Sequence, residues 1–404
     1  MPSLVPRRYL LPFVLITTLF FMWGFARSVL DVLNKHFQEA LDISLTRSTM
    51  IQGSTYVAYA LMALPAGIII TRWGYRRGVV LGLLLFAAGA FIFIPGASVM
   101  SFNLFLLALF VIGCGLAVLE TAANPYAAEL GAPATAASRL NLAQSFNGLG
   151  CILGPVTVGG FLFAGEGGSV AVPYTVMGVI VLIMAIIFSR VTLPEISIPV
   201  SDDTNATEPT VSESVKALWT NSSFRIGLLA LFCYEIAEIA INSLFINYAT
   251  SDGWLDKMTA TTVLSFGALG LFMLARIAGS AVMSRIDARK VLSVCAVMTV
   301  LGSLAVTAHL GTMSHIGVFI CYAFEAIMFP TIFAMTISGT GRHSKIASSF
   351  LMMTPLGGAV GAYLMGRVAN MSDISTAFLV PCAAYCVVLF YSLINTRKNN
   401  TVKK

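Results

Sequence analysis

Apolar segments long enough to cross a lipid bilayer recur along the whole sequence, and this feature restricts the fold more than any other. A membrane-spanning helix needs about 20 apolar residues, because its backbone polar groups must find their partners within the helix. Only 10% of the residues are charged, against roughly 25% in soluble domains. We therefore predict an all-α membrane protein. Its twelve predicted spans lie near 10–33, 48–71, 79–98, 102–128, 139–163, 172–192, 222–249, 259–284, 290–309, 314–338, 345–368 and 375–396.

The lysines and arginines predict the orientation of these spans. If both termini are cytoplasmic, nearly all basic residues near span ends fall on the cytoplasmic side, where such residues accumulate. The net charge of +6 follows from this bias and does not indicate nucleic-acid binding. We expect a multi-pass protein of the bacterial inner membrane with both termini in the cytoplasm. The basic residues on the other side are Lys35, Arg47, Lys257 and Arg367.

One long polar stretch, residues 193–221, separates the first six spans from the last six. It is rich in Ser, Thr, Pro and acidic residues, so it cannot bury a core. We expect a flexible cytoplasmic linker between an N-terminal six-helix bundle, residues 1–192, and a C-terminal six-helix bundle, residues 222–404.

The two halves repeat each other. TRWGYRR follows the second span and SRIDARK follows the eighth, while ETAANP in the fourth span matches EAIMFP in the tenth. The fifth and eleventh spans each carry two glycines four residues apart, which is a spacing for close helix contacts. Three matches in the same order, about 205–213 residues apart, indicate a duplicated transporter with two pseudo-symmetric bundles.

These motifs resemble the major facilitator superfamily and, more narrowly, the family of the L-fucose:proton symporter and the glucose/galactose porters. The resemblance runs from about residue 10 to 395. It implies a central sugar site, alternating access, and symport of a fucose- or hexose-like monosaccharide with protons, with sodium as the alternative coupling ion. The segments that carry it are LETAANPY (119–126), RLNLAQSFN (139–147), PAGIII (65–70), FPTIF (329–333) and SSFLMMTPLGG (348–358).

Ion coupling requires an acid within the membrane, where a charge costs at least ~2.5–3.5 kcal/mol. The resemblance implies this role for the carboxylates that match Asp31 and Glu120. Because burial disfavours the charged form, a neutral acid can pass through the conformational change and release its proton on the other side. Arg27 stands four residues before Asp31, where the family usually has asparagines, and could pair with it. Such a pair would keep Asp31 charged, which favours Glu120 as the proton carrier.

Further acids lie in the second half. Glu235 and Glu238 are three residues apart, and Asn242 continues the same helix face, so this stripe is predicted to line a cavity. Glu325 stands where the family is usually uncharged, and Arg276, which matches a family arginine, is the expected charge partner of one of these acids. We expect at least one of the three acids to be protonated at neutral pH. Their number leaves open an amino-sugar or cationic substrate.

Amide side chains recur every three residues on the fifth span and suit sugar hydroxyls, because amides both donate and accept hydrogen bonds. Aromatic side chains can stack on a sugar ring, although packing is their commoner role. The predicted sugar-binding residues, besides Glu238, Asn242 and Glu325, are Asn124, Asn141, Gln144, Asn147, Tyr59 and Phe146.

Four arginines in the two repeated loops are candidates for a cytoplasmic gate that pairs with acids when the inner side is closed. Anchoring by the positive-inside rule explains their presence equally well. These residues are Arg72, Arg76, Arg285 and Arg289.

The sequence does not favour an enzyme or a sensor. It has no P-loop, no cluster of His, Cys and Asp with metal-ligand spacing, and no soluble domain that could bind ATP or transmit a signal. We expect no cofactor and no metal. The expected partners are the sugar, the coupling proton or sodium ion, and the lipid bilayer, and we expect the chain to act as a monomer.

Overall fold

The computed structural model describes residues 4–40, 45–154, 157–158, 171–191, 209–251 and 253–402. Within these ranges the side chains of 30–40, 45–53, 257–258, 261 and 397–402 lie outside the description. The first half contains α1 (Leu10–Ala40), α2 (Leu45–Ser98), α3 (Phe102–Glu129), α4 (Ala136–Gly154) and α6 (Ala171–Arg190). The second half contains α7 (Val211–Thr220), α8 (Ser222–Ser251), α9 (Lys257–Thr262), α10 (Leu269–Met283), α11 (Ala288–Thr307), α12 (Thr312–Glu325), α13 (Met328–Ser338), α14 (Ser344–Leu351), α15 (Leu356–Met371) and α16 (Leu379–Val402).

Ten of the described helical segments are long and apolar enough to cross a membrane. One of them, Ser54–Ser98, is 45 residues long and holds two predicted spans. The chain reverses there at Gly74, whose φ of 81° is readily available only to glycine. The fifth predicted span begins in α4, and its last residues, 159–163, lie outside the described part of the chain.

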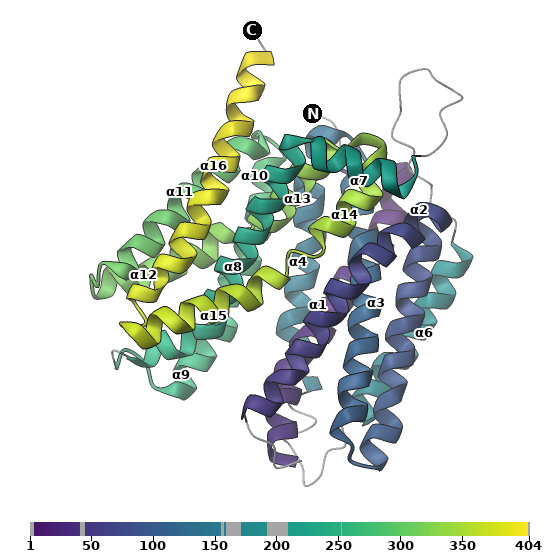
Figure 1. Ribbon diagram of the computed structural model, residues 1–404, viewed down its shortest axis with the longest axis horizontal. Coiled ribbons are helices and arrows are strands. Elements are labelled where there is room, and N and C mark those ends of the chain that lie inside the picture. The colour runs from purple at the N-terminus through teal and green to yellow at the C-terminus, as the bar shows by residue number, and fades with distance from the viewer. Residues whose placement is uncertain are drawn as a thin grey trace.

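The helices form two groups that correspond to the two halves of the sequence (Figure 1). The purple to blue helices of the first half lie together, and the green to yellow helices of the second half lie beside them. Both termini lie at one end of the molecule, which we call the terminal face. The two groups approach each other near this face and diverge toward the opposite face (Figure 1).

Glycines produce the same close helix contact in both bundles. A Cβ atom at Gly150 of α4 would overlap the backbone of α1 at Phe21, and a Cβ at Gly361 of α15 would overlap the backbone of α8 at Ile236. The fifth and eleventh spans therefore pack directly against the first and seventh spans. The repeated glycines of the sequence therefore occupy equivalent positions in the two bundles.

Part of the region that we expected to be a flexible linker, 193–221, is a helix. In α7, Thr210 Oγ1 accepts a hydrogen bond from the Glu213 amide at 3.3 Å, and the Glu213 carboxylate accepts one from the Thr210 amide at 2.8 Å. This capping box stabilises the first turn. Its hydrogen bonds, the Thr210 amide first, hold the pKa of Glu213 below its ordinary value. The Thr-x-x-Glu spacing at residues 210–213 is a sequence signature of a helix start. The polar composition of the segment outweighed it in the prediction of a flexible linker.

Candidate functional site

The embedded charged residues of the two bundles face each other across the bundle interface. Arg27 lies in the interior of α1, yet its side chain is exposed. It interacts electrostatically with Tyr56 of its own bundle and with Glu235 and Glu238 of α8 in the other bundle. A guanidinium that faced lipid would be costly, so Arg27 faces a space between the bundles that water can enter. The side chain of Asp31, its predicted partner, lies outside the described residues.

Glu120, the predicted proton carrier of the first bundle, has a defined hydrogen-bond partner. Its side chain is 9% exposed, and Oε1 accepts a hydrogen bond from the Tyr59 hydroxyl at 2.5 Å. Arg27 is one of its electrostatic neighbours. Tyr59, which we expected to stack on a sugar, therefore positions the Glu120 carboxyl in this structure.

A chain of hydrogen bonds leads from the helix of Glu120 into the second bundle. Asn124 Nδ2 donates to the Glu120 backbone carbonyl at 3.0 Å, and Gln144 Nε2 donates to Asn124 Oδ1 at 3.1 Å. Arg276 Nη1 donates to the Gln144 carbonyl at 3.3 Å, and its Nε donates to the Ala326 carbonyl at 2.7 Å. We call this series the amide–arginine chain. It ends at the residue that follows Glu325.

The amide–arginine chain changes two predictions. The expected ion pair of Arg276 with an acid is not formed with any described carboxylate; Nε and Nη1 donate to backbone carbonyls instead. Asn124 and Gln144, which we expected to bind sugar hydroxyls, have amide groups engaged in this chain. Arg276 also packs over the Phe272 ring at 4.5 Å, which adds a cation–π contact.

Short hydrogen bonds between neutral groups close the bundle interface near the terminal face. Ser138 Oγ donates to the Ser280 carbonyl at 2.6 Å, and Ser280 Oγ donates to the Ser138 carbonyl at 2.8 Å. On the other side of the interface, Ser348 Oγ donates to the Thr121 carbonyl at 2.8 Å. Each bond joins one bundle to the other. The two bundles are therefore held together at this face.

Asn141, another predicted sugar ligand, takes part in the same closure. Its Nδ2 donates to Thr331 Oγ1 of the second bundle at 3.1 Å. Its Oδ1 is buried and has no hydrogen-bond partner among the described residues. One half of this amide is thus available to a ligand or a water molecule.

The four predicted gate arginines lie at two chain reversals near the terminal face. Arg72 and Arg76 flank Gly74 within α2, Arg285 lies between α10 and α11, and Arg289 is in the first turn of α11. Arg72 and Arg285 are exposed, while Arg76 and Arg289 are half-buried. Within the described ranges no ion pair of these four with an acid is recorded. Their gating role stays a prediction, and the hydroxyl contacts above contribute to the closure of this face.

The stripe on α8 and the acid on α12 differ in burial. Glu235 is 4% exposed, Glu238 and Asn242 are half-buried, and Asn242 Oδ1 has no hydrogen-bond partner in the part of the chain that is described. Glu325 is fully buried, and its Oε2 accepts a short hydrogen bond from the Tyr385 hydroxyl. Tyr385 was not predicted, because nothing in its sequence neighbourhood marks it as a partner of an acid 60 residues away.

Two other predicted ligands lie elsewhere. Asn147 Nδ2 donates to the Phe20 carbonyl at 3.2 Å, which ties α4 to α1 within the first bundle. Phe146 is 42% exposed, and no ring contact is recorded for it among the described residues. Arg139 of the RLNLAQ segment is fully buried and donates to the carbonyls of Ala128 and Ala132, so it stabilises the end of α3.

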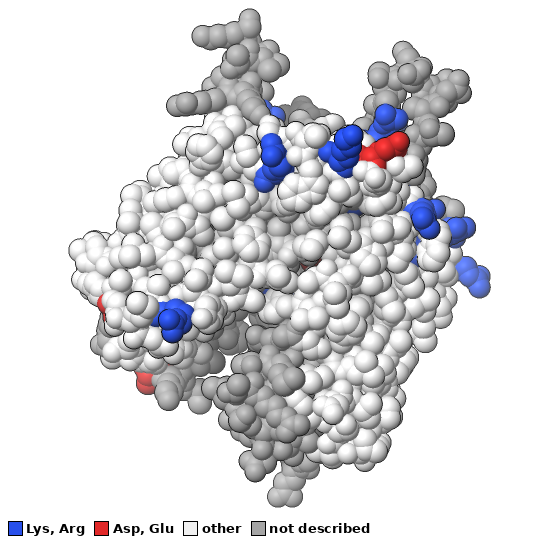
Figure 2. Space-filling view, in the orientation of Figure 1, with Lys and Arg blue, Asp and Glu red and all other residues white. Residues whose placement is uncertain are grey.

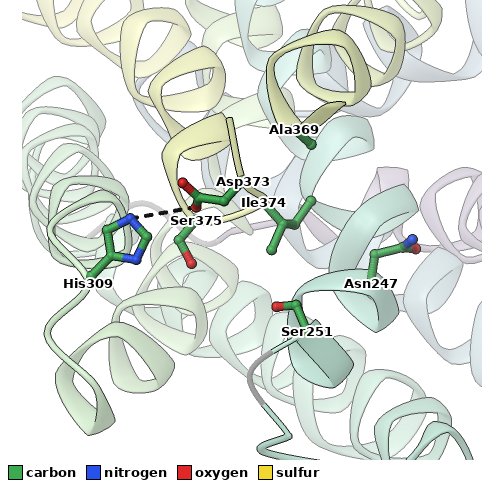
Figure 3. Close-up of a pocket in the computed structure, with 7 residues that line it drawn as sticks. All are labelled: Asn247, Ser251, His309, Ala369, Asp373, Ile374 and Ser375. Atoms are coloured by element: carbon green, nitrogen blue, oxygen red, sulfur yellow. Dashed lines mark ion pairs between the residues drawn. The ribbon is translucent and has the colours of Figure 1, made fainter. Parts of the chain in front are cut away.

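A cavity of about 440 Å³ lies at the opposite face, within the second bundle (Figure 3). His309 Nε2 lies 3.5 Å from Asp373 Oδ1 there, and hydrogen bonds from Thr376, its side chain first, hold the pKa of Asp373 below its ordinary value. None of the predicted site residues lines this cavity, so we assign the candidate site to the cluster between the bundles. The residues that line the cavity are Asn247, Ser251, His309, Ala369, Asp373, Ile374 and Ser375.

Comparison with known proteins gives similar sequences and folds over nearly the whole chain. The sequence model of the Major Facilitator Superfamily matches residues 16–362. The glucose/galactose transporter of Brucella abortus (strain 2308) is 34% identical over 396 residues, which are 95% of this chain and 93% of the relative. The L-fucose-proton symporter of Escherichia coli (strain K12) is 32% identical over 413 residues, covering 96% and 93%. A crystal structure of the transporter FucP in the outward conformation matches with a TM-score of 0.87 at 32% identity, covering 96% of this chain and 99% of that chain.

Proposed function

Because the chain belongs to the Major Facilitator Superfamily, we propose that it is a symporter that carries a monosaccharide together with protons by alternating access. The same membership confirms the predicted fold of twelve spans in two bundles and the prediction that the chain is a transporter and not an enzyme. The names of its relatives support a sugar as the substrate class.

The observation that carries proton coupling is the Glu120–Tyr59 pair at the bundle interface. Glu120 is largely buried, retains some contact with the space between the bundles, and has a neutral hydroxyl as its hydrogen-bond donor. Closing the bundles over an ionised carboxylate costs several kcal/mol, since the charge loses its remaining water. A proton on Glu120 removes that cost. The loaded transporter therefore closes more easily than the unprotonated one.

Alternating access requires the contacts at the terminal face to open. Figure 2 shows most of the visible Lys and Arg side chains toward that face, which supports its assignment to the cytoplasm. The structure then corresponds to an outward-facing state of a protein with cytoplasmic termini. The interface bonds, such as the Ser138–Ser280 pair, contribute about 0.5–1.5 kcal/mol each. Their sum is within the range that substrate binding can offset.

The sugar is proposed to bind between Arg27 of the first bundle and the α8 stripe of the second. Arg27 supplies hydrogen-bond donors, while Glu238 and Asn242 supply acceptors from the opposite side. Hydroxyl groups can satisfy both sides at once, so a neutral sugar fits the arrangement. Glu235 and Glu238 also favour an amino sugar, which is the second candidate substrate. Sodium is the alternative coupling ion.

The test is transport by the purified protein in proteoliposomes. Labelled L-fucose, D-glucose, D-galactose and D-glucosamine would be compared in counterflow, and then in uptake driven by a pH gradient or by a sodium gradient. We expect counterflow of at least one neutral sugar and uphill uptake with the pH gradient alone. Uphill uptake driven by the sodium gradient alone would identify sodium, and not the proton, as the coupling ion. Failure of all four sugars in counterflow would contradict the proposed substrate class.

A further inference from the structure

The second bundle has an acid at the place that corresponds to Glu120. Glu120 and Glu325 each stand five residues before a proline in the repeated motifs. Each is buried, and each accepts a hydrogen bond from a tyrosine hydroxyl, Tyr59 in the first bundle and Tyr385 in the second. The duplication therefore supplies one buried acid in each bundle. The tyrosine partners lie on helices that are not counterparts, Tyr59 on α2 and Tyr385 on α16.

In the part of the chain that the structure describes, Glu325 has a single hydrogen-bond donor, Tyr385, to stabilise a charged carboxylate. The side chain has no exposed surface, and its Oε1 has no hydrogen-bond partner among the described residues. An isolated carboxylate in such a site is strongly disfavoured relative to the neutral acid. The charged and titratable groups that face it are Arg276 of α10, Tyr234 and Glu238 of α8, Tyr385 of α16, and Cys321 and Tyr322 of its own helix.

Arg276 is the cation among these groups, and in this structure two of its three nitrogens bind backbone carbonyls instead of an acid. Nε binds the Ala326 carbonyl and Nη1 binds the Gln144 carbonyl, and no ion pair with Glu325 is recorded between these two described residues. A proton on Glu325 is therefore the available means of neutralising it. Tyr322, one helical turn earlier, has a buried hydroxyl without a partner in the described part and can accept from the protonated acid through a water.

The bond from Arg276 to Gln144 crosses the interface that must separate when the terminal face opens. After that separation Nη1 lacks an acceptor, while Nε can keep Arg276 anchored at Ala326, the residue next to Glu325. The carboxylate of Glu325 is then the natural new partner, because charge-assisted hydrogen bonds between guanidinium and carboxylate are about twice as strong as neutral ones. Opening therefore favours the ionised form of Glu325, and closing favours the protonated form.

We propose that Glu325 is a second proton-carrying site. It is protonated while the terminal face is closed. It loses its proton when opening transfers Arg276 from the Gln144 carbonyl to the Glu325 carboxylate. The carboxyl O–H bond breaks, the proton passes to water on the terminal side, and Arg276 neutralises the carboxylate that remains. This inference rests on the proposed function and adds to it, because each transport cycle then carries one proton in each bundle.

The first test measures protonation directly and needs no sugar. Infrared difference spectra of the purified wild-type protein at neutral pH should contain the carbonyl band of a protonated acid that Glu325→Gln removes and Glu120→Gln leaves in place. A folded Glu325→Gln protein that loses no such band would overturn the proposal.

A hydroxyl deletion supports this test if Glu325→Gln does not fold. Tyr385→Phe removes the hydrogen bond to Oε2 and should move the band to higher wavenumber. Tyr174→Phe is the matched control, because Tyr174 is a fully buried tyrosine of the first bundle whose hydroxyl has no partner among the described residues. A band that is unmoved in Tyr385→Phe, or is moved equally in Tyr174→Phe, would contradict the assignment to Glu325.

The second test measures proton and sugar flux together in proteoliposomes, with the sugar that gives the strongest counterflow. We expect about two protons per sugar in the wild type and in Tyr174→Phe, and about one in Glu325→Gln. A ratio of one in the wild type that is unchanged in Glu325→Gln would overturn the second carrier and leave symport standing. Sugar transport without proton flux would remove the proposed coupling, while the infrared result would still decide the protonation of Glu325.

Discussion

The Glu120 and Glu325 sites show how a duplicated motif acquires two different environments. Glu120 is 9% exposed beside the space that Arg27 faces, whereas Glu325 is fully buried within the second bundle. Glu120 therefore communicates with the substrate space directly. Glu325 communicates with the first bundle through Arg276 and the amide–arginine chain. The repeat supplies the acid, and its neighbours determine how it responds to opening of the bundles.

The largest expected effect is the difference in uphill sugar accumulation between variants that neutralise Glu120 and Glu325 one at a time. Glu120→Gln should lower uphill sugar accumulation at least about tenfold and spare exchange, because a permanently neutral side chain still allows the loaded transporter to close. The accumulation that remains is driven by the proton on Glu325. Glu325→Gln should retain uphill accumulation at a reduced level. Both are measured in proteoliposomes with a pH gradient and in counterflow. Loss of sugar binding in Glu120→Gln would make Glu120 a substrate ligand, and equal losses in both variants would remove the distinction between the sites.

Breaking the link between the two sites should have the next largest effect. Arg276→Gln removes two hydrogen bonds to buried carbonyls, each worth about 1.5–3 kcal/mol because the donor is charged. We expect lower thermal stability and a terminal face that opens more often. The measurement is alkylation of a Ser348→Cys reporter, followed by peptide mass spectrometry because the chain has seven native cysteines.

Arg276→Lys is the control for this change. It keeps the positive charge but cannot reach both carbonyls with its single ammonium group. Its alkylation rate should lie between those of the parent reporter and Arg276→Gln. A rate in Arg276→Gln equal to that of the parent would show that the amide–arginine chain does not hold the face closed.

The sequence was sufficient for the spans, the duplication and the embedded acids, because these depend on local composition and spacing. It was not sufficient for the partners of those residues. Spacing placed Gln144 and Asn141 on a polar face of the fifth span, but that face meets the second bundle in this state. Arg276 was assigned to an acid, whereas its donors bind carbonyls that helix breaks and interbundle contacts make available. Such partners depend on how two bundles are oriented, which no local pattern records.

The two sides of the closed face differ in a way that mutation can measure. Ser280 exchanges hydrogen bonds with Ser138, whereas Gly67 lies directly against Ser349 and near the Lys345 carbonyl. Gly67→Ala should open the face more than Ser280→Ala. The added methyl would overlap the Ser349 hydroxyl, typically a cost of about 1–3 kcal/mol, whereas the lost serine bond is worth about 1 kcal/mol. The alkylation rate of the Ser348→Cys reporter measures opening in both variants. A larger increase in Ser280→Ala than in Gly67→Ala would show that the Ser138–Ser280 contact holds the face closed more strongly than the Gly67–Ser349 contact.

The smallest predicted difference concerns two corresponding turns at the opposite face. Met100, between α2 and α3, and His309, between α11 and α12, both have positive φ values, 47° and 53°. A left-handed backbone costs roughly 1–2 kcal/mol for residues other than glycine, so Met100→Gly should raise the midpoint of thermal unfolding. His309→Gly should raise it less at neutral pH, because it also removes the hydrogen bond to Thr376 and any ion pair with Asp373.

The pH dependence of thermal unfolding provides a control for the comparison of Met100→Gly with His309→Gly. The folded pKa of Asp373 lies below its ordinary value, so the contribution of its carboxylate is present above the unfolded pKa and is lost as pH falls through the folded pKa. Below that range His309 no longer faces a charged partner, and the two glycine variants should gain stability more equally. Thermal unfolding in detergent at pH 7 and at the lowest pH that keeps the protein folded measures this. If the difference in unfolding midpoint between Met100→Gly and His309→Gly stayed constant with pH, the Asp373 carboxylate would contribute nothing to the stability of the turn at His309.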